Sequence, residues 1–383
     1  MNTTKLKNVC VVVSGTTPKS TDERYWNGTH VWITPAELSE DSFIVTDSER
    51  HITDEAIKAT GLKPFPKGTV LLSSRAPIGK VAIAGCEMYC NQGFKNLICS
   101  ESIYNLYLYY FLKSKTAYLN SLGRGATFKE ISKGIVEDIS IPFPVYSEQI
   151  RIAKQLQKIS ELISLKKGQY RYFDDIIRSR FIEMFGDSQS NPKGFPYKRI
   201  NEFAKCIAGA TPSTKRKEYW SNGIIPWMSS GEVNYKRIWE TEKRISQIGY
   251  DSCSTKMIPA HTVVIAMAGQ GRTRGTVAVA EIPLCTNQSL CSIITDGTVD
   301  TDYLFTYLQF QYNNLRNISN GSSGRGGLNI KLIGQFAVLV PPLAIQQKFS
   351  NFLKEIDKSK MAVQKSLDEL EILKKSLMQT YFG

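Results

Sequence analysis

The sequence Gly-Thr-Thr-Pro at residues 15–18, followed by Tyr-Trp at residues 25–26, returns later in the chain as Gly-Ala-Thr-Pro at 209–212 and Tyr-Trp at 219–220. The distance between the two copies is 194 residues for both motifs. Further matches follow in the same order: Trp32 with Trp227, Glu37 with Glu232, Gly79 with Gly275, Asn91-Gln92 with Asn287-Gln288, Pro144 with Pro342, and Gln149 with Gln347. The offset rises only from 194 to 198, so the sequence predicts an internal duplication whose copies differ by a few loop insertions.

The bulk composition favours a globular protein with a polyanionic partner. With 383 residues and 42% hydrophobic content, the chain can bury the cores of two or three domains, and the repeat favours two. The net charge of +13 indicates nucleic acid ahead of a membrane surface, although many soluble proteins are simply basic.

Targeting, metal and disulfide signals are weak. No apolar run of about 18 residues occurs, so we expect no membrane span, and the start of the chain makes a poor signal peptide. The eight cysteines form no Cys-x-x-Cys pair, and the three histidines have no ligand spacing, so zinc is not expected. These features favour a cytoplasmic protein with reduced thiols.

The chain divides into five predicted segments. Short apolar runs between Gly and Pro turns, together with a helical pattern at 103–115, indicate a mixed α/β domain that the second copy repeats. The predicted segments are a first domain at residues 1–146, a long helix at 147–186, a linker at 187–196, a second domain at 197–343 and a second long helix at 344–383.

Both long segments have a heptad seam of apolar residues. The first seam comprises Ile152, Leu156, Ile159, Ile163, Tyr170, Phe173, Ile177 and Met184, and the second comprises Phe349, Leu353, Ile356, Val363, Leu367, Leu370, Leu377 and Tyr381. Since one helix cannot bury such a seam alone, we infer that the two helices pair, in an antiparallel arrangement. The alternatives are that each helix packs on its own domain, or that the seams drive homodimerisation.

Motifs for enzymatic chemistry are missing. The sequence has no phosphate-binding Gly-x-x-x-x-Gly-Lys-Ser/Thr loop, no glycine fingerprint for a nucleotide cofactor, and no Asn/Asp-Pro-Pro-aromatic tetrad of an amino-methyltransferase. None of the three histidines lies in a recognisable nucleophile arrangement. The chain is therefore predicted to bind rather than to catalyse.

Three kinds of polar loop could contact DNA. Hydroxyl and cationic residues beside the Gly-x-Thr-Pro turns suit phosphate contacts, Arg and Gln in the loop between two central strands suit base edges, and the glycine-rich basic loops suit close approach to phosphate. The candidates are Lys19, Ser20, Thr21, Ser213, Lys215, Arg216 and Lys217 beside the turns; Arg75, Gln270, Arg272 and Arg274 between the strands; and Arg124, Lys129, Arg325 and Lys331 in the glycine-rich loops.

Each of these loops also has a purely structural interpretation. The turn loops could be solvated surface, and the loop between the strands could be a hairpin tip that is free to vary. The repeated Tyr-Trp pairs are expected to pack in the core rather than stack on bases. The repeated Asn-Gln pairs are expected to make buried hydrogen bonds.

Taken together, these motifs resemble the specificity subunit of type I restriction–modification enzymes. The resemblance rests on Gly-x-Thr-Pro, Tyr-Trp, Trp and Glu in each half, on the Pro-x-x-x-(Glu/Gln)-Gln entry to each long helix, and on the order domain, helix, domain, helix. It covers essentially the whole chain.

The resemblance implies an α+β fold with two target recognition domains, an antiparallel coiled coil and an internal pseudo-twofold repeat. It further implies that each domain reads one half of a split double-stranded DNA target, with the helices setting the gap. The implied partners are two methyltransferase (modification) subunits and restriction/translocase subunits. No cofactor is expected in this chain, since S-adenosylmethionine and ATP would be bound by those partners. The alternatives are a stand-alone DNA-binding regulator, or a methyltransferase or nuclease with degenerate motifs.

Overall fold

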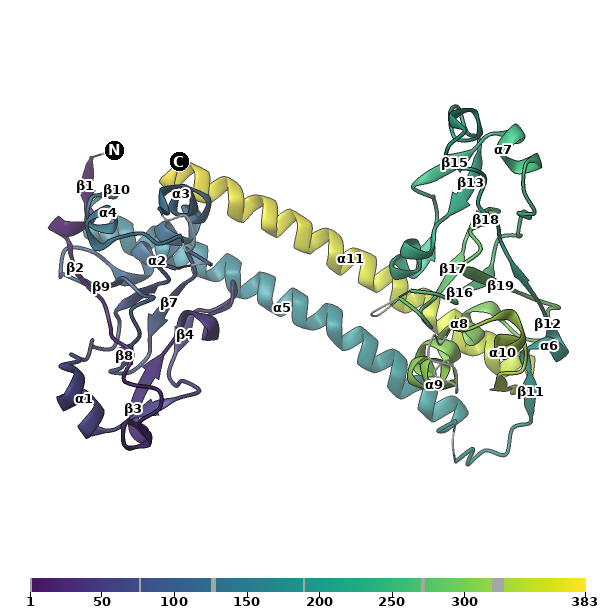
Figure 1. Cartoon of the computed structure of the whole chain (residues 1–383), viewed down its shortest axis with the longest axis horizontal. Coiled ribbons are helices and arrows are strands. Elements are labelled where there is room, and N and C mark those ends of the chain that lie inside the picture. Colours follow the sequence, from purple (N-terminus) through teal and green to yellow (C-terminus); the bar gives the residue numbers. More distant parts are fainter. Residues whose placement is uncertain (1, 76, 125–128, 189, 270–272, 319–326) are drawn as a thin grey trace. The chain divides into compact units, whose positions relative to one another are not determined.

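The computed structural model describes residues 2–75, 77–124, 129–188, 190–269, 273–318 and 327–383. It contains two compact units, each with a globular domain on which two long helix segments pack (Figure 1). The first unit combines Met1–Gln169 with Val363–Gly383, and the second spans Tyr170–Ala362. The first unit is therefore completed by residues from the far end of the chain.

A five-stranded sheet in the order β2-β9-β6-β7-β4 forms the centre of the first domain. Its neighbouring strands are antiparallel, except that β4 runs parallel to β7. A three-stranded sheet has the order β5-β3-β8, and β1 pairs with β10. The strands are β1 (Thr3–Lys5), β2 (Cys10–Val13), β3 (Trp26–Ile33), β4 (Ile44–Val45), β5 (His51–Ile52), β6 (Val70–Leu72), β7 (Val81–Ala84), β8 (Tyr89–Cys90), β9 (Asn96–Cys99) and β10 (Ser140–Pro142).

One helix of the first domain is buried on all sides. All seven residues from Leu106 to Leu112 in α2 (Asn105–Ser114) are buried, because the helix lies between the large sheet and the long helices. Short helical segments complete the domain: η1 (Leu6–Asn8), η2 (Glu23–Tyr25), η3 (Pro35–Glu37), α1 (Asp54–Thr60), α3 (Thr116–Leu122) and α4 (Lys133–Glu137).

The second domain repeats the first, strand for strand. Its sheets have the orders β12-β19-β16-β17-β14 and β15-β13-β18, and β11 pairs with β20. The elements are β11 (Tyr197–Arg199), α6 (Ile200–Phe203), β12 (Ala204–Ala208), η4 (Lys217–Tyr219), β13 (Ile225–Met228), η5 (Ser230–Tyr235), β14 (Arg237–Ile238), β15 (Lys243–Ile245), α7 (Gln247–Asp251), β16 (Thr262–Ala266), β17 (Val277–Ala280), β18 (Cys285–Thr286), β19 (Leu290–Thr295), α8 (Thr301–Phe310), α9 (Tyr312–Ile318), α10 (Ile330–Gly334) and β20 (Ala337–Leu339). The predicted duplication and the mixed α/β character of each domain are confirmed.

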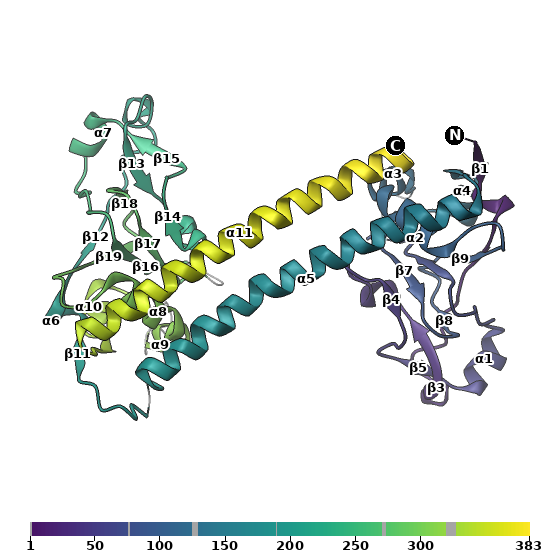
Figure 2. The ribbon, with the colours of Figure 1, turned by 180° about the vertical axis from the view of Figure 1, so that it is seen from behind.

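The long helices are α5 (Tyr146–Phe185) and α11 (Leu343–Phe382), and they pair within both units (Figure 2). In the first unit the Tyr381 hydroxyl donates to Gln155 Oε1 at 2.9 Å, and Lys167 pairs with Glu371 at 3.2 Å. In the second unit Lys360 pairs with Asp174, and the rings of Phe185 and Phe349 lie 5.4 Å apart. Residue numbers fall along α11 as they rise along α5, so the predicted antiparallel pairing is confirmed.

The ends of both helices also enter domain cores. Phe382 is buried in the first domain, with its ring 5.2 Å from that of Tyr107. Phe181 and Phe185 lie outside the predicted seam of α5, yet both are buried against Tyr303 in the second domain. Both rings also contact Phe349 of α11, at 5.3 and 5.4 Å, so the seam prediction missed two residues that pack on the domain and on the partner helix at once. Packing on a domain and pairing between helices therefore occur together.

The register of the second helix entry differs from the sequence prediction by one residue. Gln149 is buried and donates through Nε2 to the Pro144 carbonyl, and the residue that does the same in the second copy is Gln346, which donates to Pro341. The predicted equivalents, Pro342 and Gln347, are exposed. The pairs Pro144 with Pro342 and Gln149 with Gln347 were therefore wrong, because neighbouring Pro-Pro and Gln-Gln residues made two alignments possible.

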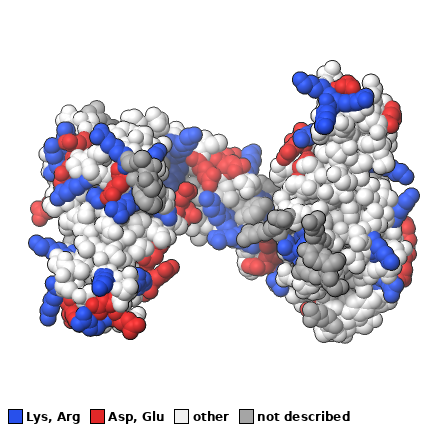
Figure 3. Space-filling model, in the orientation of Figure 1, with Lys and Arg blue, Asp and Glu red and all other residues white. Residues whose placement is uncertain are grey.

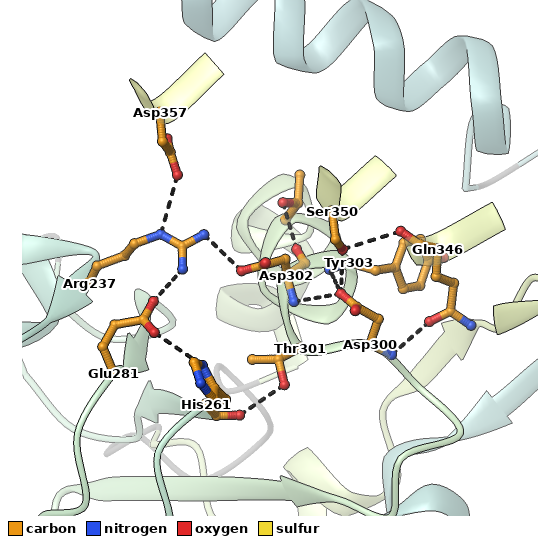
Figure 4. Close-up of polar contacts among 11 residues, drawn as sticks. Arg237, His261, Glu281, Asp300, Thr301, Asp302, Tyr303, Gln346, Ser350 and Asp357 are labelled. Carbon is orange, nitrogen blue, oxygen red and sulfur yellow. Dashed lines mark hydrogen bonds and ion pairs between the residues drawn. The ribbon is translucent and has the colours of Figure 1, made fainter. Parts of the chain in front are cut away.

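Polar contacts hold α11 on the start of α8 (Figure 4). The Asp300 amide donates to Gln346 Oε1 at 2.8 Å, and the Ser350 hydroxyl donates to Asp300 Oδ1. In the first domain, Gln149 Oε1 likewise accepts from the backbone amide of Tyr104, the residue before α2, at 2.9 Å. Both domains therefore have the same glutamine contact.

Arg237 adds an ionic link that has no counterpart among the described residues of the first domain. Its guanidinium contacts Glu281, then Asp302 at 2.7 Å and Asp357 of α11 at 3.5 Å (Figure 4). The Glu281 side chain is only 3% exposed and also faces His261 Nδ1 at 3.2 Å. Burial raises the pKa of Asp357 although the charge of Arg237 opposes this. In the first domain Ile44 occupies the position of Arg237 in the sheet.

Two glycines mark where the Gly-x-Thr-Pro loops cross the small sheets. A Cβ on Gly15 would lie 1.7 Å from the carbonyl oxygen of Cys90, and one on Gly209 would lie 1.8 Å from that of Thr286. Next to the first glycine, the Thr16 amide donates to the Cys90 carbonyl at 3.1 Å. Only a residue without a side chain permits this backbone approach.

We predict that Gly15→Ala or Gly209→Ala lowers the free energy of unfolding by about 3 kcal/mol, because a backbone carbonyl must move. Gly168→Ala is the matched control. Nothing lies within 4 Å of a Cβ at this helical position, so it should raise stability by up to about 1 kcal/mol. Urea unfolding of the three variants measures the difference, and equal stability of Gly15→Ala and the wild type would contradict the argument.

We further predict that Arg237→Met destabilises the second unit by about 3 kcal/mol, because it leaves the buried Glu281 carboxylate without its main partner. Arg178→Met, at an exposed position on α5, is the control and should change stability by less than about 0.5 kcal/mol. Amide hydrogen exchange of the second unit is the measurement. Equal protection in the two variants would show that the ionic link does not stabilise the unit.

Candidate nucleic-acid interface

Two tryptophans hold the Gly-x-Thr-Pro loop of the first domain. Trp32 is buried and donates through Nε1 to the Thr16 carbonyl at 3.1 Å. Trp26 is also buried, and its ring lies 5.1 Å from that of Trp32. Its Nε1 donates to the Lys19 carbonyl at 3.2 Å. The loop is therefore fixed at both ends, and Lys19, Ser20 and Thr21 are exposed beyond it.

The second domain holds its loop in the same way. Trp227 donates to the Ala210 carbonyl at 3.0 Å and Trp220 to the Ser213 carbonyl at 3.2 Å, with the two rings 5.0 Å apart. Of the repeated Tyr-Trp pairs, Trp26 is buried, whereas Tyr25, Tyr219 and Trp220 are half-buried, so the expected core packing is confirmed for Trp26 and is only partial for the other three. Ser213 and Lys215–Lys217 are exposed after the held turn, and these residues carry three cationic side chains.

The threonine of each loop contacts the repeated Asn-Gln turn. Thr17 Oγ1 donates to Gln92 Oε1 at 2.6 Å, and Thr211 makes the same bond to Gln288. Gln92 and Gln288 are exposed, so the expectation of buried hydrogen bonds is wrong for these two. The side-chain amides of these two glutamines face the turn loops at the surface. The Asn closes the Asn-Gln turn instead, since Asn91 Oδ1 accepts from the Gly93 backbone amide at 2.9 Å.

Two of the predicted loops and Lys95 meet at Glu130 in the first domain. Arg75 Nε donates to Glu130 Oε2 at 2.9 Å. The other carboxylate oxygen accepts from Lys95 Nζ at 3.1 Å, and Lys95 Nζ also lies 3.5 Å from the Gln92 carbonyl. The Glu130 backbone pairs with that of Arg124, whose amide donates to the Glu130 carbonyl at 3.1 Å. Arg75 and Arg124, distant in sequence, are thereby brought to one place, and Lys129 is exposed beside them.

The Glu130 carboxylate is ionised in this arrangement. Partial burial acts to raise its pKa, but hydrogen bonds from Arg75 and Lys95 and their positive charges outweigh it. The net pKa of Glu130 therefore lies below its ordinary value. The Lys95 side chain is only 10% exposed, so its charge needs this partner.

The second domain has a cleft at the corresponding place. Its volume is about 440 Å³, and its lining residues are Met267, Ala268, Gln288, Ser289, Leu328, Asn329, Ile330 and Lys331. Lys331 is exposed and half-buried Arg274 lies in the turn before β17. The predicted residues Gln270, Arg272 and Arg325 lie outside the described residues. The cleft therefore opens beside Gln288, which contacts the second turn loop.

The basic residues of the second turn loop lie at a different place from this cleft. Tyr219, two residues after Lys217, accepts through its carbonyl from the Ser246 amide at 2.9 Å, which places the loop against α7. Figure 3 shows Lys and Arg side chains gathered at the upper tip of the second domain, where Figure 1 places β13, β15 and α7.

Sequence reasoning missed Lys95 and Glu130. Lys95 precedes β9 in a buried stretch from Gly93 to Leu97. A charged residue within such a stretch was the signal that could have identified it as functional. Glu130 gave no signal, because its partners lie 35 and 55 residues away along the chain.

Other kinds of site are absent from the described parts of the chain. They hold no group of three or more His, Cys, Asp or Glu residues that could bind a metal ion. All eight cysteines are free thiols. None of the described helices combines the length and apolar character needed to cross a membrane.

Comparison with known proteins matches most of the chain to one family. The model of the type I restriction modification DNA specificity domain matches twice, at residues 1–171 and 192–371. The type I restriction enzyme MjaIX specificity subunit of Methanocaldococcus jannaschii is 28% identical over 98% of this chain and 90% of its own length. The EcoR124I/EcoR124II specificity subunit of Escherichia coli is 24% identical over 64% of this chain and 62% of its own.

Solved structures share the fold. The type I restriction–modification S subunit from M. genitalium aligns over 100% of this chain and 96% of its own, with a TM-score of 0.63 and 16% identity. A chain from a structural study of complex assembly and conformational transition of the type I R-M system aligns over 100% of this chain and 97% of its own, with a TM-score of 0.64 and 16% identity. With the two matched domains, the repeated sheet topology and the paired helices, the chain belongs to the family of type I restriction–modification specificity subunits.

Proposed function

We propose that this chain is the DNA-reading, non-catalytic subunit of a type I restriction–modification complex. Each domain would read one half of a bipartite double-stranded DNA target, and the paired helices α5 and α11 would set the gap. One observation carries this proposal. The same contacts hold the Gly-x-Thr-Pro loop in both domains, whereas the residues at the loop tips beside it differ in chemistry. Trp, Thr and Gln hold equivalent loops in both domains, while the tip has Arg75 and Glu130 in one and a cleft at Met267 and Lys331 in the other.

The charge supports nucleic acid as the ligand. The chain has a net charge of +13, and the predicted turn-loop residues of both domains are exposed. Lysines at such loops contribute salt-dependent affinity through phosphate contacts, while sequence is read by side chains at base edges. We therefore assign Lys19–Thr21, Ser213 and Lys215–Lys217 to phosphate contacts. Arg124, Lys129, Arg325 and Lys331 of the glycine-rich loops are likewise assigned to phosphate. Arg75 is assigned to base edges of the first half-site, and Gln270, Arg272 and Arg274 to base edges of the second.

The catalytic steps would belong to partner subunits. We propose that two modification subunits use S-adenosylmethionine and that restriction/translocase subunits use ATP, so that this chain needs no cofactor. Exposed apolar residues on the long helices, namely Leu162, Leu165, Ile372 and Leu373, support docking of protein partners. A stand-alone regulator would instead bind its full target without partners, and a degenerate enzyme would modify DNA alone.

The proposal predicts that helix length sets the gap between half-sites. Removal of seven residues, one heptad, from the middle of both α5 and α11 keeps the seam in register and shortens each helix by about 10 Å. The accepted gap should then shorten by about three base pairs while both half-sites stay the same. Sequencing of methylated adenines in cells that supply the partner subunits measures target and gap.

Removal of the heptad from α5 alone is the control, because it leaves the seams unmatched and should abolish methylation. A shortened pair of helices that still directs methylation at the original gap would refute the spacer. Loss of both half-sites together would instead show that the domains were damaged.

A second prediction separates phosphate contacts from base contacts. Replacing Lys215 and Lys217 by Ala should weaken DNA binding equally for all sequences and reduce the slope of log affinity against log salt by about 2, since each phosphate contact contributes about 0.9. Replacing Lys354 and Lys365, two exposed lysines of α11, removes the same charge away from the loops and should leave the slope unchanged. Titrations at several salt concentrations provide the measurement, and a change confined to one base position would contradict the phosphate assignment.

A further inference from the structure

We propose that Glu130 is a positioning residue that orients Arg75 to read a guanine in the first half-site, and that buried Lys95 holds Glu130 in place. This inference rests on the proposed function, since it assigns the chemistry by which one domain reads its half of the target. The three residues form a connected cluster, which we call the Arg75 cluster.

The hydrogen bonding of Arg75 leaves its reading edge available. Glu130 engages Nε at 2.9 Å, and among the described residues no hydrogen bond to the two terminal nitrogens is present. The side chain is 45% exposed. Two parallel N–H groups from these nitrogens are the arrangement that matches O6 and N7 of guanine in the major groove. A free arginine would have to lose much of its rotational freedom on binding, whereas Nε is already fixed here.

Glu130 is itself held at both its side chain and its backbone. Its second oxygen accepts from Lys95 Nζ at 3.1 Å, and its amide donates to the Arg124 carbonyl at 3.0 Å. The next amide, of Ile131, donates to the Ser74 carbonyl at 3.0 Å, which places the Glu130 backbone beside that of Arg75. The carboxylate therefore has a fixed position from which to orient the guanidinium.

The charge of the Arg75 cluster also suits DNA. An isolated arginine–glutamate pair would be neutral and would set a carboxylate against the phosphate backbone. Lys95 compensates Glu130 from the buried side, where its side chain is 10% exposed. The cluster thus keeps a net charge of +1, and that charge lies on the exposed arginine.

Among its described residues the second domain has no equivalent of the cluster, which makes the effect specific to one half-site. The Leu328 amide donates to the Met267 carbonyl at 3.0 Å, as Ile131 does to Ser74, so Ala268 and Gly327 occupy the positions of Arg75 and Glu130. Strand register places Cys291 at the position of Lys95. No residue of this second set can form the ionic cluster.

The test compares Glu130→Gln, Arg75→Ala and the double variant, in the complex with its partner subunits. The target is the DNA sequence that the wild-type complex methylates. Affinity is measured for an unmethylated duplex with this sequence and for duplexes in which each half-site base pair is replaced in turn. Arg75→Ala should lose discrimination at a single guanine of the first half-site by about tenfold or more. Glu130→Gln should lose discrimination at the same guanine by a smaller factor and leave the second half-site unchanged.

The double variant separates positioning from a structural role. If Glu130 acts through Arg75, Glu130→Gln adds nothing to Arg75→Ala. Glu137→Gln is the matched control, because Glu137 makes the same kind of ion pair on α4, with Lys133 at 3.6 Å, away from Arg75. It should bind like the wild type. Thermal unfolding of all variants checks that the first unit remains folded.

Two failures are distinguishable. If the wild-type complex shows no bipartite target, the proposed function itself fails. If it reads both half-sites but Glu130→Gln leaves the first unchanged, weakens both equally, or adds its effect to Arg75→Ala, then only the positioning role is overturned.

Discussion

The burial of two apolar seams is the constraint on which the whole architecture depends. A 40-residue helix with a continuous seam cannot satisfy it alone, so α5 requires α11 and the chain must return antiparallel to itself. The same return brings Phe382 into the first domain and places Phe181 and Phe185 against the second. Helix pairing and domain packing thus occur together in each unit, and neither domain core is closed by its own residues alone.

Within each domain, fixed loops are separated from variable tips. The glycine that touches a backbone carbonyl, the tryptophan indoles and the Thr–Gln bond are the same in both copies, so they hold a scaffold rather than recognise a sequence. The tips differ in length and in chemistry, from an ionic cluster around Glu130 to a cleft beside Gln288. This division allows one fold to present two different reading surfaces.

The sequence was sufficient for those features that repeat or are periodic. Duplication, strand-rich domains, seams and antiparallel pairing all follow from patterns that a single chain displays. The register at Gln346 was not recoverable, because Gln346 and Gln347 are chemically alike and only burial distinguishes them. The Lys95–Glu130–Arg75 contacts were not recoverable either, because they depend on loops that only the fold brings together. Arg75, Arg124, Lys129 and the other loop residues remain predictions as DNA contacts.

The position of Phe382 bears on the order in which the protein is made. Residues 1–169 are synthesised before Val363–Gly383, the segment that completes their core. At roughly 5–20 residues per second, about 10 to 40 seconds pass before that segment is synthesised. During this interval the nascent first domain exposes the apolar surface around Tyr107 and Phe111 that Phe382 later covers. The core of the first domain is therefore completed only by a segment that is synthesised well after its other parts.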